Sequence, residues 1–314
     1  MAIMKIISKA WLTKFPACFP KSYGSSAIEV QCPPCYNIKM NQAFSFLSHD
    51  EERTLSDYCE NHFVSYNDRP CEDLSFLDFW KAFISSLEEK GAEKAINTML
   101  IPNLPLRLKD AGGISAQIYK SVAGLIPVVE ISDSQDFENL TVNLIHKGKS
   151  PENIGSTGAS FVYGKKTRFI ILSKKPYSNV SAKSMGLGEE EWLEKSMKIR
   201  LEHECTHFFT KKFFGVSMNH LHDELIADFF GLLSAFGSYK AEYFEYFMGI
   251  KGSEGSRLAC YIPDCSKNLL SALKEKASKA AAFLEELQKE EDFSKLSHSD
   301  KIRFLCQKPL LKLD

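Results

Sequence analysis

The sequence predicts an α+β protein that is mostly helical, in which a small sheet precedes two long helices. Three observations predict this arrangement. Two short β-rich runs, 159–163 and 167–173, are joined by a Gly-Lys-Lys turn and are typical of a hairpin. A helical pattern with apolar positions at steps of three and four follows over 189–213. A second helical pattern begins near Asn219, a good cap, and ends at Ala235 or Phe236.

The N-terminal part of the chain divides into two expected regions. Residues 1–40 are expected to be an irregular leader, because their prolines discourage long elements. Residues 41–124 are expected to be a helical region that ends in a loop containing Pro102, Pro105 and Gly112-Gly113. An apolar stripe at helical spacing supports the helical region and is expected to be core: Phe76, Phe79, Trp80, Phe83 and Leu87.

Residues 125–314 are expected to form one domain that contains the sheet and the long helices. The run 125–131 indicates a strand, and 137–146 indicates a short helix. The stretch 266–290 predicts an amphipathic helix that closes the domain or binds a partner. Its apolar positions follow steps of three and four: Leu269, Leu273, Ala277, Ala280, Leu284 and Leu287.

The expected helix over 189–213 has charges that suit both of its ends. Three glutamates, 189–191, complement the positive N-terminus, and Lys211 with Lys212 complements the negative C-terminus. Gly215 then allows the chain to leave the helix. One face of this helix is expected to point inward: Trp192, Ser196, Ile199, His203 and His207.

His203-Glu204-Cys205-Thr206-His207 is the most informative stretch of the chain. Its two histidines are four residues apart, so on a helix both rings leave the same face and can share one metal ion. Glu204 lies beside the first ring, where it can act on water that the metal activates. This is the HExxH pattern of zinc-dependent peptidases, in which two ligands are combined with a general base. Cys205 is expected to point away from the ligand face and to pack.

The missing ligand is expected on the second helix. A catalytic zinc usually takes three protein ligands and keeps one position for water. Glu224 follows His207 by seventeen residues, and Asp228 lies one turn further on, where it can orient a ligand histidine. Two acids on an otherwise apolar face would be costly to bury unless a cation or a donor met them. His220 and His222 are near enough in sequence to replace Glu224 as the third ligand.

Together, His203-Glu204-x-x-His207 and Glu224-x-x-x-Asp228 resemble the gluzincin group of thermolysin-like zinc metallopeptidases. The resemblance implies a zincin-like domain in which a small sheet precedes the metal-binding helix. It also implies that His203, His207 and Glu224 bind zinc, that Glu204 is the base, and that Asp228 bonds a ligand histidine. The run 168–203 resembles a family of uncharacterised bacterial proteins, which implies no substrate.

The function expected from these residues is zinc-dependent hydrolysis of peptide bonds in a peptide or protein substrate, with water activated by zinc and Glu204. The strand 168–172 is the expected sheet edge that would align an extended peptide. Five side chains are possible donors to the oxyanion: Tyr239, Tyr243, Tyr246, Tyr261 and His298. The alternative is a metal-binding regulatory or interaction protein with a zincin-like fold and narrow or no peptidase activity.

Composition excludes several other classes of function. The 314-residue chain is 44% hydrophobic and 25% charged with a net charge of −1, so no nucleic-acid or anionic-membrane partner is expected. No apolar run approaches the roughly 20 residues that a membrane span needs. Lysines interrupt the apolar pattern of residues 1–18, which makes them a poor signal peptide, so a cytoplasmic location is expected. The sequence carries no signal for an oligomeric state.

The nine cysteines have no regular spacing, so a disulfide framework is not expected. Cys32-Pro33-Pro34-Cys35 is a CxxC pair, which can be half of a zinc site or a redox pair. No second CxxC accompanies it, and a Pro-rich turn is the expected structure there.

Overall fold

The structure, a computed structural model, describes residues 44–70, 72–103, 105–151, 154–164, 168–251, 257–261 and 265–313. These residues belong to one compact unit. The expected leader over 1–40, with Cys32 and Cys35, lies outside the described residues, and so do Lys165 and Lys166 of the expected turn.

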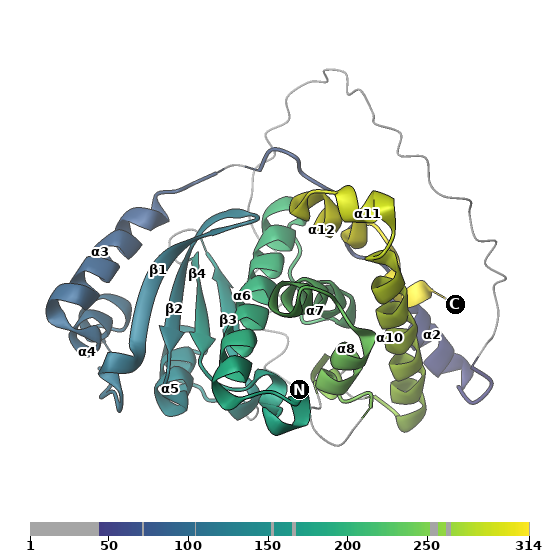
Figure 1. The fold of residues 1–314 in the computed structure, drawn as a ribbon, viewed down its shortest axis with the longest axis horizontal. Helices are drawn as coiled ribbons and strands as arrows, with labels where there is room; N and C mark the ends of the chain where they lie inside the picture. The colour runs from purple at the N-terminus through teal and green to yellow at the C-terminus, as the bar shows by residue number, and fades with distance from the viewer. Residues whose placement is uncertain are drawn as a thin grey trace. The chain divides into compact units, whose positions relative to one another are not determined.

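Four strands form one mixed sheet in the order β1-β2-β4-β3 (Figure 1). The strands are β1 (Ile114–Ser121), β2 (Gly124–Ile131), β3 (Ala159–Tyr163) and β4 (Arg168–Ser173). β1 pairs with β2 and β3 pairs with β4 in antiparallel fashion, whereas β2 and β4 are parallel. The strand expected over 125–131 and the hairpin formed by β3 and β4 are therefore confirmed.

The expectation that residues 168–172 form the edge of the sheet is wrong. β4 lies between β2 and β3, and all six of its residues are buried. A near-continuous apolar run is what a strand covered on both faces requires, and Phe169-Ile170-Ile171-Leu172 has that pattern. Among the described strands, the edges of the sheet are β1 and β3, and the residues of β3 are all half-buried.

β1 is a strand in the region that was expected to be helical up to residue 124. Its alternation of Ile114, Ala116, Ile118 with polar residues is the period-2 signal of a strand. The expected boundary at 124/125 falls at the start of β2, close to the tight turn of the β1–β2 hairpin. Among the described residues, no domain boundary lies at 124/125, because β1 and β2 pair across it.

Helices cover both faces of the sheet. In β4, Phe169 and Ile171 pack into one core with residues of α3 (Phe76–Lys90), α4 (Ala92–Ala95) and α5 (Ser134–Leu144). Ile170 and Leu172 pack into the opposite core, which includes α6 (Glu189–Phe214). The expected aromatic stripe lies in the first core at Phe76, Trp80 and Phe83, but Phe79 is 38% exposed. The helix expected over 137–146 begins three residues earlier because Asp133 caps it by accepting a hydrogen bond from the Asp136 N–H.

The second core continues into a helical layer on the far side of α6 (Figure 1). α7 (Leu221–Phe236) packs against α6, and α10 (Lys267–Leu287) packs against both α7 and α8 (Ala241–Phe247). The expected C-terminal helix is confirmed as α10, and Ser266 caps it. The helices of this half are α2 (His49–Tyr58), α7 (Leu221–Phe236), α8 (Ala241–Phe247), α9 (Leu258–Tyr261), α10 (Lys267–Leu287), α11 (Glu291–Lys295) and α12 (His298–Cys306). Shorter turns are the π-helical Ile96–Leu100 and the 3-10 turns Ala111–Gly113, Ile154–Ser156, Tyr177–Asn179, Lys183–Met185 and Leu310–Lys312.

The two long helices of the motif region lie within about two residues of their expected bounds. α6 ends at Gly215, whose φ of 72° is a left-handed conformation that glycine adopts without steric cost. The expected cap of α7 is wrong by one residue. His220, and not Asn219, is the N-cap, because the His220 ring accepts a hydrogen bond from the His222 N–H.

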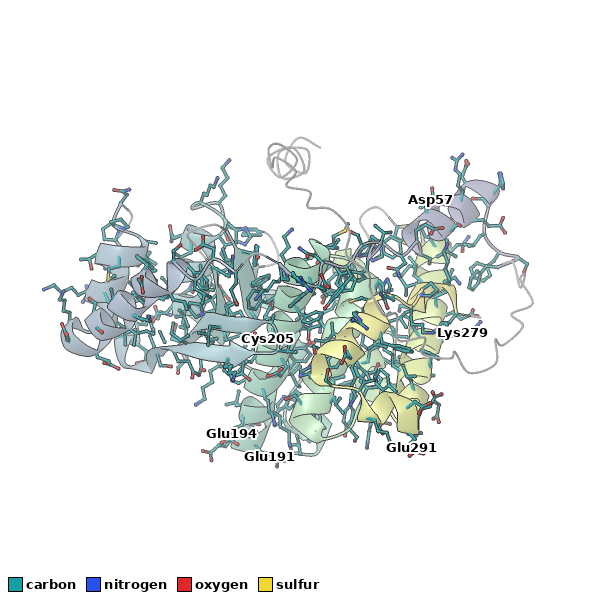
Figure 2. The ribbon with its side chains drawn as sticks, turned by 90° about the horizontal axis from the view of Figure 1, so that it is seen from above. Asp57, Glu191, Glu194, Cys205, Lys279 and Glu291 are labelled. Carbon is teal, nitrogen blue, oxygen red and sulfur yellow. The ribbon has the colours of Figure 1, made fainter. Side chains whose placement is uncertain are left out.

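The described cysteines are free thiols, as expected for a chain without a disulfide framework: Cys59, Cys205, Cys260, Cys265 and Cys306. Figure 2 shows Cys205 among the side chains of the interior, whereas Glu191 and Glu194 of the same helix lie at the periphery. Cys205 is fully buried, which agrees with a packing role. Among the described helices, none is long and apolar enough to span a membrane.

Candidate metal centre

A close approach between α6 and α7 positions the centre. Gly231 of α7 faces the backbone of Ile199 on α6, and a Cβ at position 231 would lie 2.7 Å from the Ile199 carbonyl oxygen. Only glycine fits this distance. Glu224 lies two turns before Gly231, and His203 lies one turn after Ile199. The two helices therefore bring Glu224 beside the histidines of the motif.

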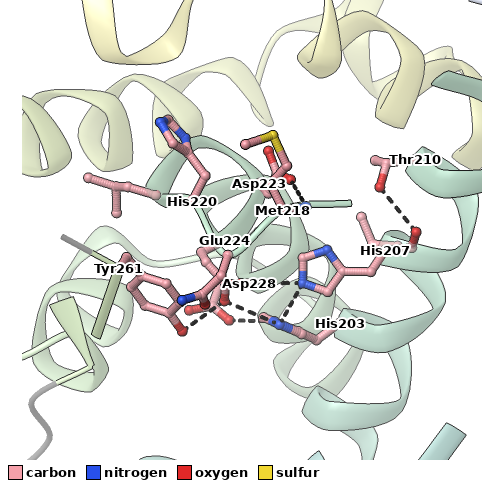
Figure 3. Close-up of polar contacts among 12 residues, drawn as sticks. His203, His207, Thr210, Met218, His220, Asp223, Glu224, Asp228 and Tyr261 are labelled. Atoms are coloured by element: carbon pink, nitrogen blue, oxygen red, sulfur yellow. Dashed lines mark hydrogen bonds and ion pairs between the residues drawn. The ribbon is translucent and has the colours of Figure 1, made fainter. Parts of the chain in front are cut away.

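Two imidazole nitrogens and the two oxygens of one carboxylate meet at this crossing (Figure 3). His203 Nε2 lies 3.4 Å from Glu224 Oε2, and His207 Nε2 lies 3.4 Å from Glu224 Oε1. The two Nε2 atoms are 3.1 Å apart. A tetrahedral zinc ion with ligand bonds of 2.0–2.1 Å separates its ligand atoms by about 3.3 Å. The donor set and its spacing thus fit one metal ion with a fourth position left for water or substrate.

Asp228 orients the first histidine. His203 Nδ1 donates a hydrogen bond to Asp228 Oδ1 over 2.7 Å, and the Asp228 side chain is fully buried. Since a carboxylate only accepts, the proton of the neutral ring lies on Nδ1 and the Nε2 lone pair faces the centre. The structure therefore places Asp228 where the sequence predicts it.

The centre requires positive charge. Burial acts to lower the pKa of His203, but Glu224 and Asp228 outweigh it and raise this pKa to about 10. Burial acts to raise the pKa of Glu224, but the two histidines hold it well below its usual range. The two buried carboxylates face Arg257 and the two histidines, so they stabilise a proton on His203 or a metal ion beside it in addition to the charge of Arg257.

Glu204 lies on the same helix and lines the same cavity as the histidines. Burial raises the pKa of its carboxyl, and His203 and His207 partly offset that effect. No described residue donates a hydrogen bond to the Glu204 carboxylate. Its oxygens are therefore free to accept a proton from a water or a substrate group.

Arg257 and Tyr261 belong to the centre although the sequence does not predict the role of Arg257. Arg257 Nη2 lies 2.9 Å from Glu224 Oε2, and Nη1 lies 3.1 Å from Asp228 Oδ2. The Tyr261 hydroxyl donates to Glu224 Oε2 over 2.9 Å. The Tyr177 hydroxyl donates to Asp228 Oδ1 over 2.5 Å. Both carboxylates are therefore held in place, and Glu224 Oε1 stays free of these donors.

Of the five possible oxyanion donors, Tyr261 is the one that lines the cavity of the centre. Tyr239 is fully buried, and its hydroxyl has no hydrogen-bond partner among the described residues. Tyr243 and Tyr246 pack near Phe247, and His298 packs against Phe230.

His220 and His222 do not take the place of Glu224. His220 Nδ1 accepts the His222 N–H, and Nε2 lies 2.9 Å from the Tyr58 carbonyl oxygen, so both ring nitrogens bond the backbone. The His222 ring packs against Phe63, and burial lowers its pKa to about 3. Neither residue belongs to the group formed by His203, His207 and Glu224.

A second group of potential ligands consists of His62, His220 and Asp223. His220 has no free ring nitrogen, as described above. Asp223 Oδ1 lies 2.5 Å from His62 Nε2, and Oδ2 accepts the Met218 N–H over 2.7 Å. These contacts connect the segment after α2 to the start of α7. Hydrogen bonds therefore account for the closeness of His62, His220 and Asp223 without a metal ion.

A cavity of about 490 Å³ opens onto the centre, a size typical of ligand-binding sites. The edge strand β3 contributes Ala159, Ser160 and Phe161 to its wall, and Gly158 precedes them. Arg200, one turn before Glu204 on α6, also lines the cavity. Arg200 is four residues before Glu204, so helical spacing alone would predict that it lies on the same face of α6. Arg257 lies far in sequence from Glu224 and from the histidine motif, with only Tyr261 of the centre near it, and no pattern links it to Glu224.

Residues 165–314 match the model of a family described as a family of unknown function (DUF7005). The matched segment is a little under half of the 314-residue chain, and it contains every residue of the candidate metal centre. No curated protein and no solved structure matches the chain. The resemblance to gluzincins therefore stays a prediction that depends on the residues themselves.

Proposed function

We propose that this protein hydrolyses peptide bonds with a zinc ion bound by His203, His207 and Glu224. The observation that supports the proposal is that the two histidine Nε2 atoms lie 3.1 Å apart and each lies 3.4 Å from one oxygen of the Glu224 carboxylate, which is close to the ligand spacing of a tetrahedral site. When bound, zinc supplies a Lewis acid that polarises a carbonyl group and makes water acidic near neutral pH.

Glu204 acts as the general base in this proposal. Its carboxylate lines the cavity beside both histidines and receives no hydrogen bond from the described residues. It takes a proton from the attacking water and delivers it to the leaving amine.

The positive charge of Arg257 assists at the carbonyl oxygen. Arg257 and Tyr261 line the cavity beside Glu224, but the Tyr261 hydroxyl donates to Glu224 Oε2, and the Arg257 N–H groups are engaged by Glu224, Asp228 and two tyrosine hydroxyls. Negative charge that develops on the carbonyl oxygen during attack is therefore stabilised by a cation that is already in position, without a direct hydrogen bond. Tyr177 and Asp228 hold the Arg257 guanidinium there, since Arg257 Nη1 lies 2.6 Å from the Tyr177 hydroxyl.

A peptide is the substrate class that the sheet favours. β3 is an edge strand with β4 on one side only, and its residues Ala159 to Phe161 face the cavity. An extended peptide can pair with the free backbone groups of such a strand. Pairing there would place a peptide bond alongside Glu204.

The test is the zinc content of purified protein, measured by plasma mass spectrometry. About one zinc per chain is expected in the wild type, and loss of zinc is expected in His203→Ala and Glu224→Ala. His49→Ala, a substitution of an exposed histidine on α2, is the matched control and should keep its zinc. A wild type that takes up no zinc from a supplemented buffer would contradict the proposal.

The second candidate function is a metal-binding regulatory or interaction protein with narrow or no peptidase activity. The observation in its favour is that Arg257 and Tyr261 both donate hydrogen bonds to Glu224 Oε2. The donors beside the centre are therefore already engaged by protein groups and not directed at a substrate. A screen of zinc-loaded protein against a peptide library separates the two functions. Cleavage that disappears in Glu204→Gln supports the hydrolase, and binding without cleavage supports the alternative.

A further inference from the structure

Three residues supply the ligands of the candidate metal centre, but four of their atoms meet there. His203 Nε2 lies 3.4 Å from Glu224 Oε2, and His207 Nε2 lies 3.4 Å from Glu224 Oε1. A zinc ion that bound both histidines and both oxygens would have four protein ligands, as structural zinc sites have. A zinc ion that bound one of the oxygens would keep a position for water. The way in which Glu224 binds therefore decides whether the centre is open.

The two oxygens of the Glu224 carboxylate have different surroundings. Oε2 lies 2.9 Å from Arg257 Nη2 and accepts a hydrogen bond from the Tyr261 hydroxyl over 2.9 Å (Figure 3). A carboxylate oxygen has two lone pairs, so these two donors use the acceptor capacity of Oε2. None of the described contacts of Arg257 and Tyr261 is with Oε1, which faces the His207 ring. Oε1 therefore keeps lone pairs that can face a metal ion.

The Tyr261 hydroxyl is oriented as a donor to Oε2 by its contacts with Arg257. The Tyr261 oxygen lies 3.2 Å from Arg257 Nε and 3.0 Å from Arg257 Nη2. A guanidinium group can only donate, so the phenol oxygen accepts from Arg257, and its single proton is left for the carboxylate. The two residues thus act on Oε2 as a pair.

Arg257 is held on its other side by Asp228 and Tyr177. Arg257 Nη1 lies 3.1 Å from Asp228 Oδ2 and 2.6 Å from the Tyr177 hydroxyl. Asp228 is fully buried and also accepts the hydrogen bond from His203 Nδ1. The carboxylate that orients one histidine therefore also anchors the cation that covers Oε2. Movement of Arg257 away from this place would deprive a buried carboxylate of its counter-charge, which is unfavourable.

The charges at the centre balance when zinc and Arg257 are both present. Three carboxylates lie there, those of Glu204, Glu224 and Asp228. When all three are ionised, their negative charge equals the positive charge of a zinc ion and one guanidinium together. Buried charges are stable when they are paired. Arg257 therefore complements a bound zinc ion and need not leave Glu224 when zinc binds.

We propose that Arg257 and Tyr261 are positioning residues that restrict Glu224 to metal binding through Oε1 alone. This inference rests on the proposed function, because it concerns the zinc site of that function. With Oε2 engaged, the protein offers three ligand atoms, one from each of His203, His207 and Glu224. The fourth position of a tetrahedral zinc ion then stays open to water or substrate. The two residues thus keep a site of the open, catalytic kind from becoming a closed, structural one.

The test is X-ray absorption of the zinc-loaded protein, which reports the number of atoms bound to zinc and the distance from zinc to the Glu224 carboxyl carbon. That distance is short only when both oxygens bind. The wild type should show four bound atoms and a long zinc–carbon distance. In the double variant Arg257→Met with Tyr261→Phe, Oε2 loses both donors, so it should bind zinc and shorten the distance. The matched control combines Arg53→Met, an exposed position on α2, with Tyr243→Phe on α8 and should give the wild-type spectrum.

A purely structural role for Arg257 and Tyr261 predicts a different result. Loss of structural support would lower the zinc content of the double variant, whereas release of Oε2 should leave about one zinc per chain. Zinc loss from a folded double variant would therefore contradict the inference. Binding through both oxygens in the wild type, or an unchanged spectrum in the folded double variant, would overturn it as well. Turnover does not decide, because the charge of Arg257 also acts at the carbonyl oxygen.

Thermal unfolding verifies that each variant is folded, because loss of Arg257 leaves buried carboxylates without their partner. If the double variant does not fold, the wild type and Tyr261→Phe decide. The single change frees one lone pair of Oε2, so the zinc–carbon distance should shorten, and an unchanged distance would overturn the inference. A wild type that takes up no zinc would contradict the proposed function together with this inference. Zinc bound through both oxygens of Glu224, with peptide cleavage intact, would contradict the inference alone.

Discussion

At the scale of single residues, the centre combines a donor set that the motif predicts with contacts that it does not. His203, His207 and Glu224 are brought together by two helices, and Asp228 fixes one ring. Arg257 and Tyr261 come from another part of the chain and hold Glu224 from the opposite side. On the proposed function, we expect each of these side chains to have a separable effect on metal binding or on turnover.

Glu204→Gln should leave zinc content unchanged while lowering the rate of peptide hydrolysis by about 10²- to 10⁴-fold, because the amide cannot accept the proton. The measurement is kcat/KM with the best peptide from the library screen, together with zinc content. Glu194→Gln, an exposed position on the same helix, should behave as the wild type. Turnover at the normal rate in Glu204→Gln would remove Glu204 from the mechanism.

Asp228→Asn should weaken zinc binding by about 10- to 100-fold, because the amide no longer fixes the His203 tautomer through a charged hydrogen bond. Competition with a chromogenic chelator measures the affinity. Asp57→Asn on the exposed side of α2 provides the control. Equal zinc affinity in Asp228→Asn and the wild type would mean that Asp228 serves only the Arg257 ion pair.

At the scale of elements, the crossing of α6 and α7 decides whether the ligands meet. Gly231 is the contact point, and a Cβ there would lie 2.7 Å from a backbone oxygen that cannot rotate away. The separation of the two helices is therefore set by this one position. The spacing of the donor atoms depends on it.

Gly231→Ala should force the helices apart and lower the free energy of unfolding by about 1–3 kcal/mol. Helix propensity alone would favour alanine by about 1 kcal/mol, so a net loss must come from the clash. Zinc affinity should fall as well. Chemical denaturation and zinc titration measure both effects, with Gly112→Ala as control, where the added Cβ would meet Asp110 Oδ1 at 3.6 Å. A stabilised variant with full zinc affinity would refute this account of the crossing.

The sequence predicts the elements with strong local signals and misses those that depend on pairing partners. The position of α6 follows from its charged ends and its glycine C-cap, and that of α10 follows from its apolar periodicity and its Ser266 N-cap. β1 was missed beside a loop rich in Pro and Gly, although its alternation was present. The edge of the sheet could not be predicted, because strand order depends on the parallel pairing of β2 with β4 and not on either strand alone. The spacing of His203 and His207 can be predicted because it lies within one helix. The contact of Arg257 with Glu224 cannot, because it depends on how distant parts of the chain pack.

At the scale of the whole molecule, the centre joins two long helices of the second core. A metal ion that binds the folded chain but not the unfolded chain should therefore stabilise the whole fold against unfolding. The ligands lie on separate helices, so a locally unfolded chain would lose them.

Zinc at about 100 times its dissociation constant should stabilise the protein by about 2.7 kcal/mol. For a chain of this size, that change corresponds to roughly 4–5 °C in the unfolding temperature. Calorimetry in the presence of zinc and after chelation measures the difference, and His203→Ala should show almost none. An unfolding temperature that ignores chelation in the wild type would argue against a bound metal.

The place of β4 in the sheet has a consequence for how the chain can be divided. β4 is hydrogen-bonded to β2 on one side and β3 on the other, and both neighbours precede residue 165. Asp223, beside the ligand Glu224, is likewise paired with His62. A fragment cut to the family segment 165–314 would expose both edges of a strand that is fully buried in the whole chain, and it would leave a buried acid without its partner. The family segment is therefore a unit of sequence comparison, whereas the unit of folding also includes the strands and the histidine that come before it.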